Sequence, residues 1–301
     1  MKYTFSLGSD KKVRLDKFLS QNLTTGTRTH IQKLIKKGRV TVSGETITDS
    51  SYSLRQGERI EIQYEEPMRI ELAPESIEFE VIYEDEHIIV INKPAGLVVH
   101  PGSGIHSHTL VNALLHHTKQ LSSINRKRPG IVHRLDRQTT GVMVIAKNNT
   151  AQKDLAAQFK NHQIKKTYIA IVEGRLAYDE DIIELPIARS LKHRERMQVD
   201  LSRGKDAKTR YKVLERIDSA TLVQINLLTG RTHQVRVHFS HINHPVWGDP
   251  RYGDKNKHPF CLHAFKLGLT HPVSRKYLEF EAKSPYDMIE LLKRLKNQKH
   301  D

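Results

Sequence analysis

Residues 130–146 have the sequence GIVHRLDRQTTGVMVIA, and this stretch gives the strongest indication of fold and function. Residues 141–146 are continuously apolar, which is typical of a strand covered on both faces. The polar residues directly before it predict a loop, and loops held by buried elements commonly carry functional side chains. Asp136 lies between Arg134 and Arg137, whose charges favour an ionised carboxylate that can act as a nucleophile or a base. A surface ion pair at a turn would give the same pattern, so both interpretations stay open.

Strand patterns dominate the chain around this stretch. Regular helices do not separate the strands as they do in a Rossmann arrangement. We therefore expect an α+β domain with a mixed, largely antiparallel central sheet and flanking helices. The expected strands are residues 79–83, 88–91, 141–146, 167–173, 209–215, 221–227 and 277–282, and the expected helices are residues 109–117, 150–161 and 288–299.

The first 65 residues predict a smaller α+β unit. Two amphipathic helices, beginning near residues 14 and 29, precede short strands around residues 40–42 and 60–62. Gly38 is expected to end the second helix. Charged residues with Pro67 and Pro74 among them then indicate a linker. The sequence thus predicts two domains, residues 1–72 and residues 73–301.

The charge of the chain calls for a polyanionic partner. There are 49 Lys and Arg against 34 Asp and Glu, a formal charge of +15. Phosphate backbones attract such a protein through counterion release. A basic protein kept soluble by its charge is the alternative interpretation. Cys261 is the only cysteine, so an internal disulfide and a cysteine-based zinc site are excluded, and a small buried role is expected for it.

Targeting signals are also absent from the sequence. No apolar run approaches the roughly 18 residues that a membrane helix needs. The first residues, MKYTFS, do not form a signal peptide. We therefore expect a cytoplasmic protein without membrane contact.

The run His133-Arg134-Leu135-Asp136, followed by Thr140-Gly141, resembles the catalytic loop of the pseudouridine synthases that act on large-subunit ribosomal RNA. Further blocks agree in order along nearly the whole chain. They are YED at residues 83–85, INKPAGLVVHP at 91–101, KKTY at 165–168, TGRTHQVRVH at 229–238, HP at 244–245 and GDPRYG at 248–253. The resemblance implies that family's catalytic domain.

The same resemblance implies the reaction and its residues. The bond between N1 of uracil and the ribose breaks, the base turns, and a new bond forms through C5. Asp136 is the expected essential carboxylate, acting on the sugar, on the base, or by taking a ribose proton. Tyr168 is expected to remove the proton left on C5. Arg231 is expected to pair with Asp136 and lower its pKa, and neither a metal nor a cofactor is needed.

A uracil stacked in RNA must be flipped out before it can react. By resemblance, Arg134 is expected to fill the vacated space, because a guanidinium plane stacks on bases. His133 beside it is a second expected RNA contact.

The N-terminal segment resembles the small RNA-binding domain named after ribosomal protein S4, through RLDK at residues 14–17, GRV at 38–40 and VSG at 42–44. An ordinary solvated helix face would give similar lysines. The resemblance implies phosphate contacts from Arg28, His30, Lys33, Lys36 and Arg39.

Several alternatives remain open from the sequence. The RNA target is expected to be large-subunit ribosomal RNA, with transfer RNA as the alternative, and a ribosome assembly factor that only binds RNA would share the basic surface. Histidines 233, 238, 241 and 244 suggest a metal-dependent nuclease, but their spacing matches no familiar zinc motif. We expect a monomer that binds RNA without a metal.

Overall fold

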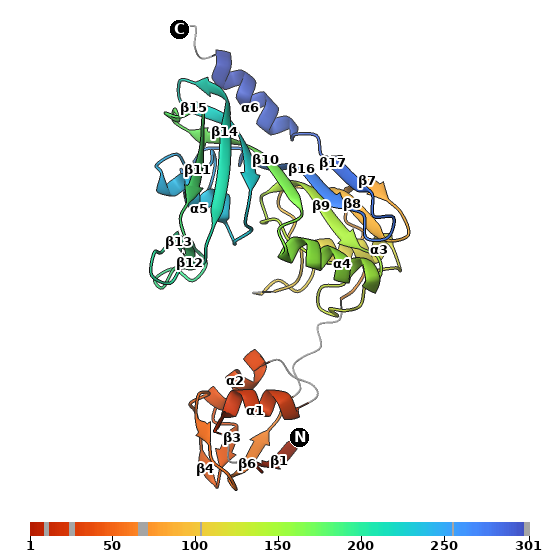
Figure 1. Ribbon diagram of the computed structural model, residues 1–301, viewed down its shortest axis with the longest axis vertical. Helices are drawn as coiled ribbons and strands as arrows, with labels where there is room; N and C mark the ends of the chain where they lie inside the picture. The colour runs from red at the N-terminus through yellow and green to blue at the C-terminus, as the bar shows by residue number, and fades with distance from the viewer. Residues whose placement is uncertain (9–11, 24–27, 66–71, 103, 255, 298–301) are drawn as a thin grey trace. The chain divides into compact units, whose positions relative to one another are not determined.

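The computed structural model describes residues 1–8, 12–23, 28–65, 72–102, 104–254 and 256–297. The chain divides into two compact units, Met1–Glu71 and Leu72–Asp301 (Figure 1). The boundary predicted from the sequence lies one residue later. Part of the predicted linker, including Pro67, and the last residues of the predicted C-terminal helix lie outside the described residues.

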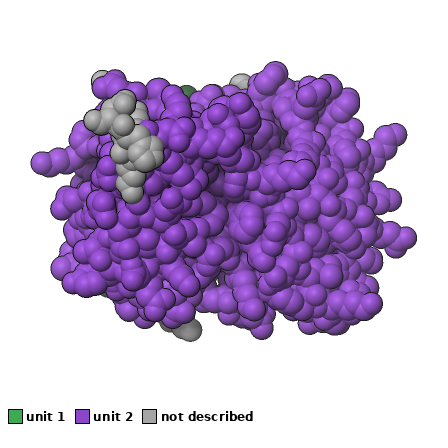
Figure 2. Space-filling model, turned by 90° about the horizontal axis from the view of Figure 1, so that it is seen from above, with its two compact units in different colours: residues 1–71 green, residues 72–301 purple. Residues whose placement is uncertain are grey.

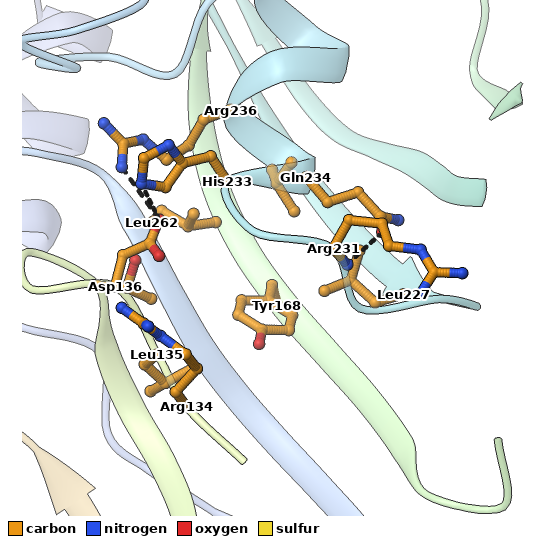
Figure 3. A pocket seen from close by; sticks show the side chains of 12 residues that line it. Arg134, Leu135, Asp136, Tyr168, Leu227, Arg231, His233, Gln234, Arg236 and Leu262 are labelled. Carbon is orange, nitrogen blue, oxygen red and sulfur yellow. Dashed lines mark hydrogen bonds and ion pairs between the residues drawn. The ribbon is translucent and has the colours of Figure 1, made fainter. Parts of the chain in front are cut away.

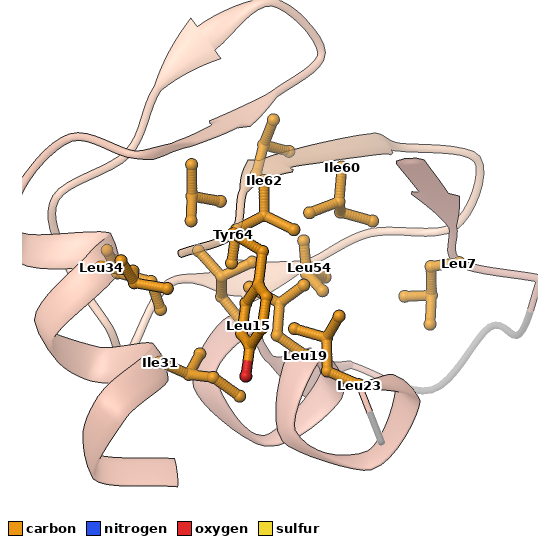
Figure 4. Packing of buried hydrophobic residues seen from close by; sticks show 13 residues of the cluster. Leu7, Leu15, Leu19, Leu23, Ile31, Leu34, Leu54, Ile60, Ile62 and Tyr64 are labelled. Atoms are coloured by element: carbon orange, nitrogen blue, oxygen red, sulfur yellow. The ribbon is translucent and has the colours of Figure 1, made fainter. Parts of the chain in front are cut away.

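Unit 1 buries one apolar core between two helices and a sheet of four strands in the order β1-β6-β3-β4. Alternate residues of β3 and β6 face the helices (Figure 4). Gly38, at a φ of 67°, ends the second helix as the sequence predicts. The elements are β1 (Lys2–Ser6), β2 (Val13–Arg14), α1 (Leu15–Asn22), α2 (Arg28–Lys36), β3 (Val40–Val42), β4 (Glu45–Thr46), β5 (Ser53–Leu54) and β6 (Arg59–Gln63).

Unit 2 is built on a nine-stranded sheet, whose strands follow the order β11-β14-β15-β10-β16-β9-β8-β7, with β17 paired to β16. Only the contact of β16 with β9 is parallel, so the predicted mixed, largely antiparallel sheet is confirmed. The strands of this sheet are β7 (Glu80–Glu84), β8 (Ile88–Lys93), β9 (Thr140–Ala146), β10 (Lys165–Glu173), β11 (Glu180–Glu184), β14 (Lys208–Ile217), β15 (Ala220–Leu227), β16 (Leu262–Thr270) and β17 (Tyr277–Glu281). A separate hairpin consists of β12 (Ile187–Arg189) and β13 (Met197–Val199).

Helices cover both faces of this sheet. Helix α3 (Leu110–His117) and helix α4 (Asn149–Lys160) lie against opposite faces of β8 and β9, which explains why both strands are apolar throughout. Helices α5 (Gln234–His241) and α6 (Tyr286–Asn297) cover opposite faces of the other half. In Figure 2, the described residues of unit 2 form one continuous body. Strand β16 and helix α5 are the main elements that the sequence patterns did not predict.

The middle of the sheet is irregular where β10, β16 and β9 meet. The pairing of β10 with β16 shifts register between Thr167 and Ile169, which is a β-bulge beside Tyr168. Bulges commonly re-aim a side chain next to an active site. On the other side of β16, Gly141 lies so close to the chain that a Cβ atom would meet the Ala264 carbonyl oxygen at 2.1 Å. Only glycine fits there, and its φ of 113° also favours glycine.

Candidate active site

A pocket opens where the two halves of the sheet meet, and three separate segments supply it. Asp136 comes from the loop before β9, Tyr168 comes from the irregular point of β10, and the third segment runs from the end of β15 into α5 (Figure 3). These segments are far apart in the sequence. The lining residues are Arg134, Leu135, Asp136, Thr139, Tyr168, Leu227, Arg231, His233, Gln234, Val235, Arg236 and Leu262.

An almost fully buried arginine holds Asp136. Arg236 Nη1 donates to Asp136 Oδ2 at 3.0 Å, while its Nε and Nη2 donate to the two oxygens of Asp249 at 2.7 and 2.9 Å. Asp249 is fully buried and also accepts hydrogen bonds from the backbone N–H groups of residues 251 and 252. Burial opposes the charge on Arg236, but its bonds to the two carboxylates raise its pKa above the usual value. One guanidinium thus joins the reactive carboxylate to a buried anchor.

This geometry corrects the predicted pairing of Asp136 with Arg231. Arg231 Nε donates to the backbone oxygen of Asp206 at 2.9 Å, and its side chain points away from Asp136 (Figure 3). Arg231 comes before α5, whereas Arg236 is on the helix. The error arose because TGRTHQVRVH contains two arginines and the sequence alone does not show which one faces Asp136.

The turn before α5 is fixed by one buried amide. Gln234 Oε1 accepts the Thr229 hydroxyl at 2.7 Å and the Arg231 N–H at 2.9 Å, and its Nε2 donates to the Lys208 carbonyl and to Thr209 Oγ1, both at 3.0 Å. These bonds saturate the amide and set the direction in which α5 starts. Arg236, on the first turn, therefore has a defined position.

A histidine lies on the same side of Asp136 as Arg236. His233 Nε2 is 3.7 Å from Asp136 Oδ2, and His233 Nδ1 is 2.8 Å from the hydroxyl of Tyr252. Burial is the main reason that the pKa of His233 falls to about 4; Asp136 opposes this effect, and Arg236 adds to it. The imidazole is therefore neutral at pH 7.

Tyr168 lies in the pocket wall and faces the space beside Asp136 (Figure 3). Burial, and secondly the negative charge of Asp136, raise the pKa of Tyr168 well above its ordinary value. Its side chain is thus a neutral phenol at pH 7, which restricts how it can take up a proton.

A buried lysine braces the loop that carries Asp136. Lys93 is fully buried, and its Nζ donates to the carbonyl oxygens of Pro94, Leu97 and Arg137 at 2.6, 3.0 and 3.1 Å. Burial lowers the pKa of Lys93 to about 7, and the charge of Asp136 partly opposes this shift. The Lys-Pro-Ala-Gly turn is thereby tied to the residue after Asp136.

The neighbours of Asp136 in the sequence have other partners. Arg137 Nε donates to the Gly96 carbonyl at 3.0 Å, and exposed Arg134 lines the pocket. In the part of the chain that the structure describes, neither arginine forms an ion pair with Asp136, so the alternative interpretation of a surface ion pair at this turn is wrong. His133 accepts the Val144 N–H at 3.0 Å and stacks on Phe159 with ring centroids 4.5 Å apart, so its ring supports β9 and lies outside the pocket lining.

The predicted RNA contacts of unit 1 have different surroundings. Lys33 and Lys36 are exposed on α2, whereas the Arg28 guanidinium binds the buried carboxylate of Asp16 at 3.0 Å. His30 Nε2 lies 2.7 Å from the backbone oxygen of Glu65. The remaining residue, Arg39, bonds Gln63 Oε1 at 3.0 Å and forms an ion pair with Glu65 at 3.4 Å.

The described ranges contain no group of three or more His, Cys, Asp or Glu side chains that could hold a metal ion. Cys261 is buried, and burial raises the pKa of its thiol to about 12, as expected for a residue with a packing role. No helix within the described residues is both long and apolar enough to span a bilayer.

Most residues that line this pocket lie in a segment that matches a known protein family. The family model for RNA pseudouridylate synthase matches residues 87–241, which include Asp136, Tyr168 and Arg236, and the S4 domain model matches residues 13–60. The chain belongs to the RNA pseudouridylate synthase family. The resemblance of the sequence motifs to pseudouridine synthases is thereby confirmed, and the protein is an RNA pseudouridine synthase with an S4 domain.

Relatives of this synthase cover nearly its whole length. An uncharacterized RNA pseudouridine synthase of Aquifex aeolicus is 46% identical over 286 residues, which make up 90% of each chain. A ribosomal large subunit pseudouridine synthase D of Zymomonas mobilis is 41% identical over 297 residues, which cover 94% of this chain and 93% of the relative. The structure of human RNA pseudouridylate synthase domain containing 1 is 25% identical, covering 77% of this chain and 97% of its own, with a TM-score of 0.58.

Proposed function

We propose that this synthase converts specific uridines in structured large-subunit ribosomal RNA to pseudouridine, with Asp136 as its essential carboxylate and without a cofactor. The observation that carries the proposal is the position of Asp136, held by Arg236 in the lining of a pocket that Tyr168 also lines. The names of several relatives refer to the ribosomal large subunit, which supports this target.

The reaction breaks one bond, forms another, and exchanges a proton on C5 for a proton on N1. The N1–C1′ bond breaks, a C5–C1′ bond forms, C5 loses its proton, and N1 gains one. Arg236 holds the Asp136 carboxylate in a fixed direction, which suits a group that attacks the sugar or the base, or that takes a ribose proton. All three roles need the negative charge, so the neutral amide of asparagine cannot replace it.

Tyr168 is the proposed group for the C5 proton. Because its phenol stays neutral, it can accept this proton only while its own proton leaves. Asp136 lines the same pocket, and we propose that its carboxylate receives that proton. The pair would then pass one proton without a free phenolate.

We propose that two regions contact RNA: the pocket, through Arg134, and the S4 domain, through basic side chains. Arg134, exposed at the pocket, would fill the space left by the flipped uracil, since its guanidinium can stack on neighbouring bases. In the S4 domain, Lys33 and Lys36 would contact phosphates together with Arg28, His30 and Arg39. The side chain of Arg28 is already oriented by Asp16, which leaves its exposed half to face RNA.

The target is tested by deleting the gene and mapping pseudouridines with carbodiimide and reverse transcription. The proposal expects one or more pseudouridines to disappear from large-subunit ribosomal RNA and to return with the wild-type gene. Loss from transfer RNA alone would assign that target instead. An unchanged map in both RNAs would contradict the proposal.

The Asp136→Asn variant distinguishes catalysis from RNA binding. This change keeps the side-chain shape and removes the charge, so the variant should bind RNA and form no pseudouridine. Complementation of every deletion phenotype by this variant would favour the assembly-factor role. Activity destroyed by EDTA on prefolded RNA would favour a metal-dependent enzyme.

A further inference from the structure

The two oxygens of Asp136 have different surroundings. Arg236 Nη1 donates to Oδ2 at 3.0 Å, and His233 Nε2 faces the same oxygen at 3.7 Å. Within the described residues, no hydrogen bond reaches Oδ1. The carboxylate is thus held on one side, and Oδ1 is available to the nucleotide.

The hydroxyl of Tyr252 is the hydrogen-bond partner of His233 Nδ1. The Tyr252 hydroxyl oxygen accepts the backbone N–H of Met197 at 2.8 Å, so its own hydrogen can point to His233 Nδ1, which lies 2.8 Å away. Burial raises the pKa of Tyr252, so this hydroxyl keeps its proton. A neutral imidazole that accepts at Nδ1 carries its hydrogen on Nε2.

The ring of Tyr252 is itself firmly placed. It lies 5.1 Å from the centre of the Arg236 guanidinium, and it packs against the buried cluster of Ile187, Ala207 and Val237. His233 has a left-handed backbone conformation, with a φ of 57° and a ψ of 20°. Non-glycine residues in this region are uncommon and often lie at functional sites. The Tyr252 hydroxyl therefore connects strand β13, through the N–H of Met197, to the residue that precedes α5, His233.

We propose that Tyr252 is a positioning residue for the isomerisation: its hydroxyl fixes His233 with hydrogen on Nε2, where it supports Asp136 Oδ2 and leaves Oδ1 to react. The 3.7 Å separation is longer than a hydrogen bond, and a shift of about 0.7 Å by the imidazole would complete one while Arg236 keeps its own bond to Oδ2. The neutral His233 imidazole, as a donor, helps to hold the Asp136 carboxylate in place. Arg236 remains the cation that is bonded to Oδ2. This inference rests on the proposed role of Asp136.

The hydrogen position is measured first, because that measurement requires no activity. Two-bond proton–nitrogen spectra of the full chain labelled with ¹⁵N-histidine distinguish the two neutral forms of each imidazole. The His233→Asn variant assigns the signal, since asparagine tolerates a left-handed backbone. We expect hydrogen on Nε2 in the wild-type protein at pH 7 and a mixture of the two forms in Tyr252→Phe. Hydrogen on Nδ1 in the wild type would overturn the proposal.

The kinetic test uses whichever RNA the wild-type protein modifies, so it does not depend on the large-subunit target. Tyr252→Phe removes only the hydroxyl and keeps the ring over Arg236. We expect kcat to fall about fivefold to tenfold, with KM for RNA within about twofold. Tyr83→Phe is the matched control, because Tyr83 also donates one hydrogen bond of 2.8 Å, but its partner, the Asp85 carboxylate, lies outside the pocket lining, whereas His233 is part of it.

A double mutant separates positioning from general stability. If Tyr252 acts through His233, Tyr252→Phe adds no further loss of kcat to His233→Asn. Independent losses that multiply, or an equal loss in Tyr83→Phe, would overturn the proposal. A failure of the proposed function looks different: hydrogen is on Nε2 and Tyr252→Phe is slower, but Asp136→Asn remains active.

Discussion

Replacing Arg236 by lysine tests how the reactive carboxylate is held. Lysine keeps the positive charge but has a single nitrogen, whereas Arg236 uses three nitrogens to bond Asp136 and Asp249 together. A lysine at this position cannot reproduce all three bonds. The change therefore loosens Asp136, weakens the buried anchor, or does both.

The magnitude follows from the bonds lost. A hydrogen bond to a charged group contributes about 1.5–3 kcal/mol, so losing the bond to Asp136 should lower kcat by about 10-fold to 150-fold. Disturbing the buried pair with Asp249 should cost about 3 kcal/mol of stability. For a unit of this size, that loss lowers Tm by about 6–12 °C.

The assay is tritium release from RNA labelled with [5-³H]uridine under single-turnover conditions, with Tm measured on the same preparations. Arg231→Lys is the control for Arg236→Lys, because Arg231 lines the same pocket but donates its hydrogen bond to the Asp206 carbonyl. We expect Arg231→Lys to change the single-turnover rate by less than about threefold. A larger loss in Arg231→Lys than in Arg236→Lys would refute the assignment and restore Arg231 as the partner of Asp136.

Three further predictions concern stability. His100 and His233 both have a pKa lowered to about 4, chiefly by burial. Each therefore gains its proton on unfolding, and the free energy of unfolding should fall by about 2 kcal/mol per histidine between pH 7 and pH 5, which a Tm series measures; a flat series would contradict this. Asp16→Asn should destabilise unit 1 by about 2 kcal/mol in hydrogen exchange, since this buried carboxylate binds two arginines; unchanged protection would count against it. Gly141→Ala should reduce soluble yield or Tm strongly because its Cβ would strike Ala264, and a normal Tm would show that β9 and β16 can separate.

The sequence predicts the local elements of this fold better than their assembly. Strand β9 is recognisable because residues 142–146 are all apolar and covered on both faces. Strand β16 was missed because buried His263, Lys266 and Gly268 interrupt its apolar pattern. His263 is satisfied by Thr140 Oγ1 at 2.8 Å, a residue 123 positions away, and no local pattern reveals such a partner.

The same limit applies to the pocket. The motifs predict that Asp136 and Tyr168 belong to one site, and the pocket brings the two together. They do not determine which arginine binds Asp136, because Arg236 is 100 residues away and is aimed by the start of α5. Asp249 and Tyr252 were recognised only as part of a motif, since their roles depend on burial and on bonds across the fold.

The central claim is that Asp136 is essential for converting uridine to pseudouridine in large-subunit ribosomal RNA. The direct measurement is tritium release from [5-³H]uridine-labelled large-subunit RNA by the wild-type protein and by Asp136→Asn, with RNA binding measured on both. We predict release by the wild type, no release by Asp136→Asn, and equal binding within about twofold. Release by Asp136→Asn at the wild-type rate, or none by the wild-type protein on this RNA, would contradict the account.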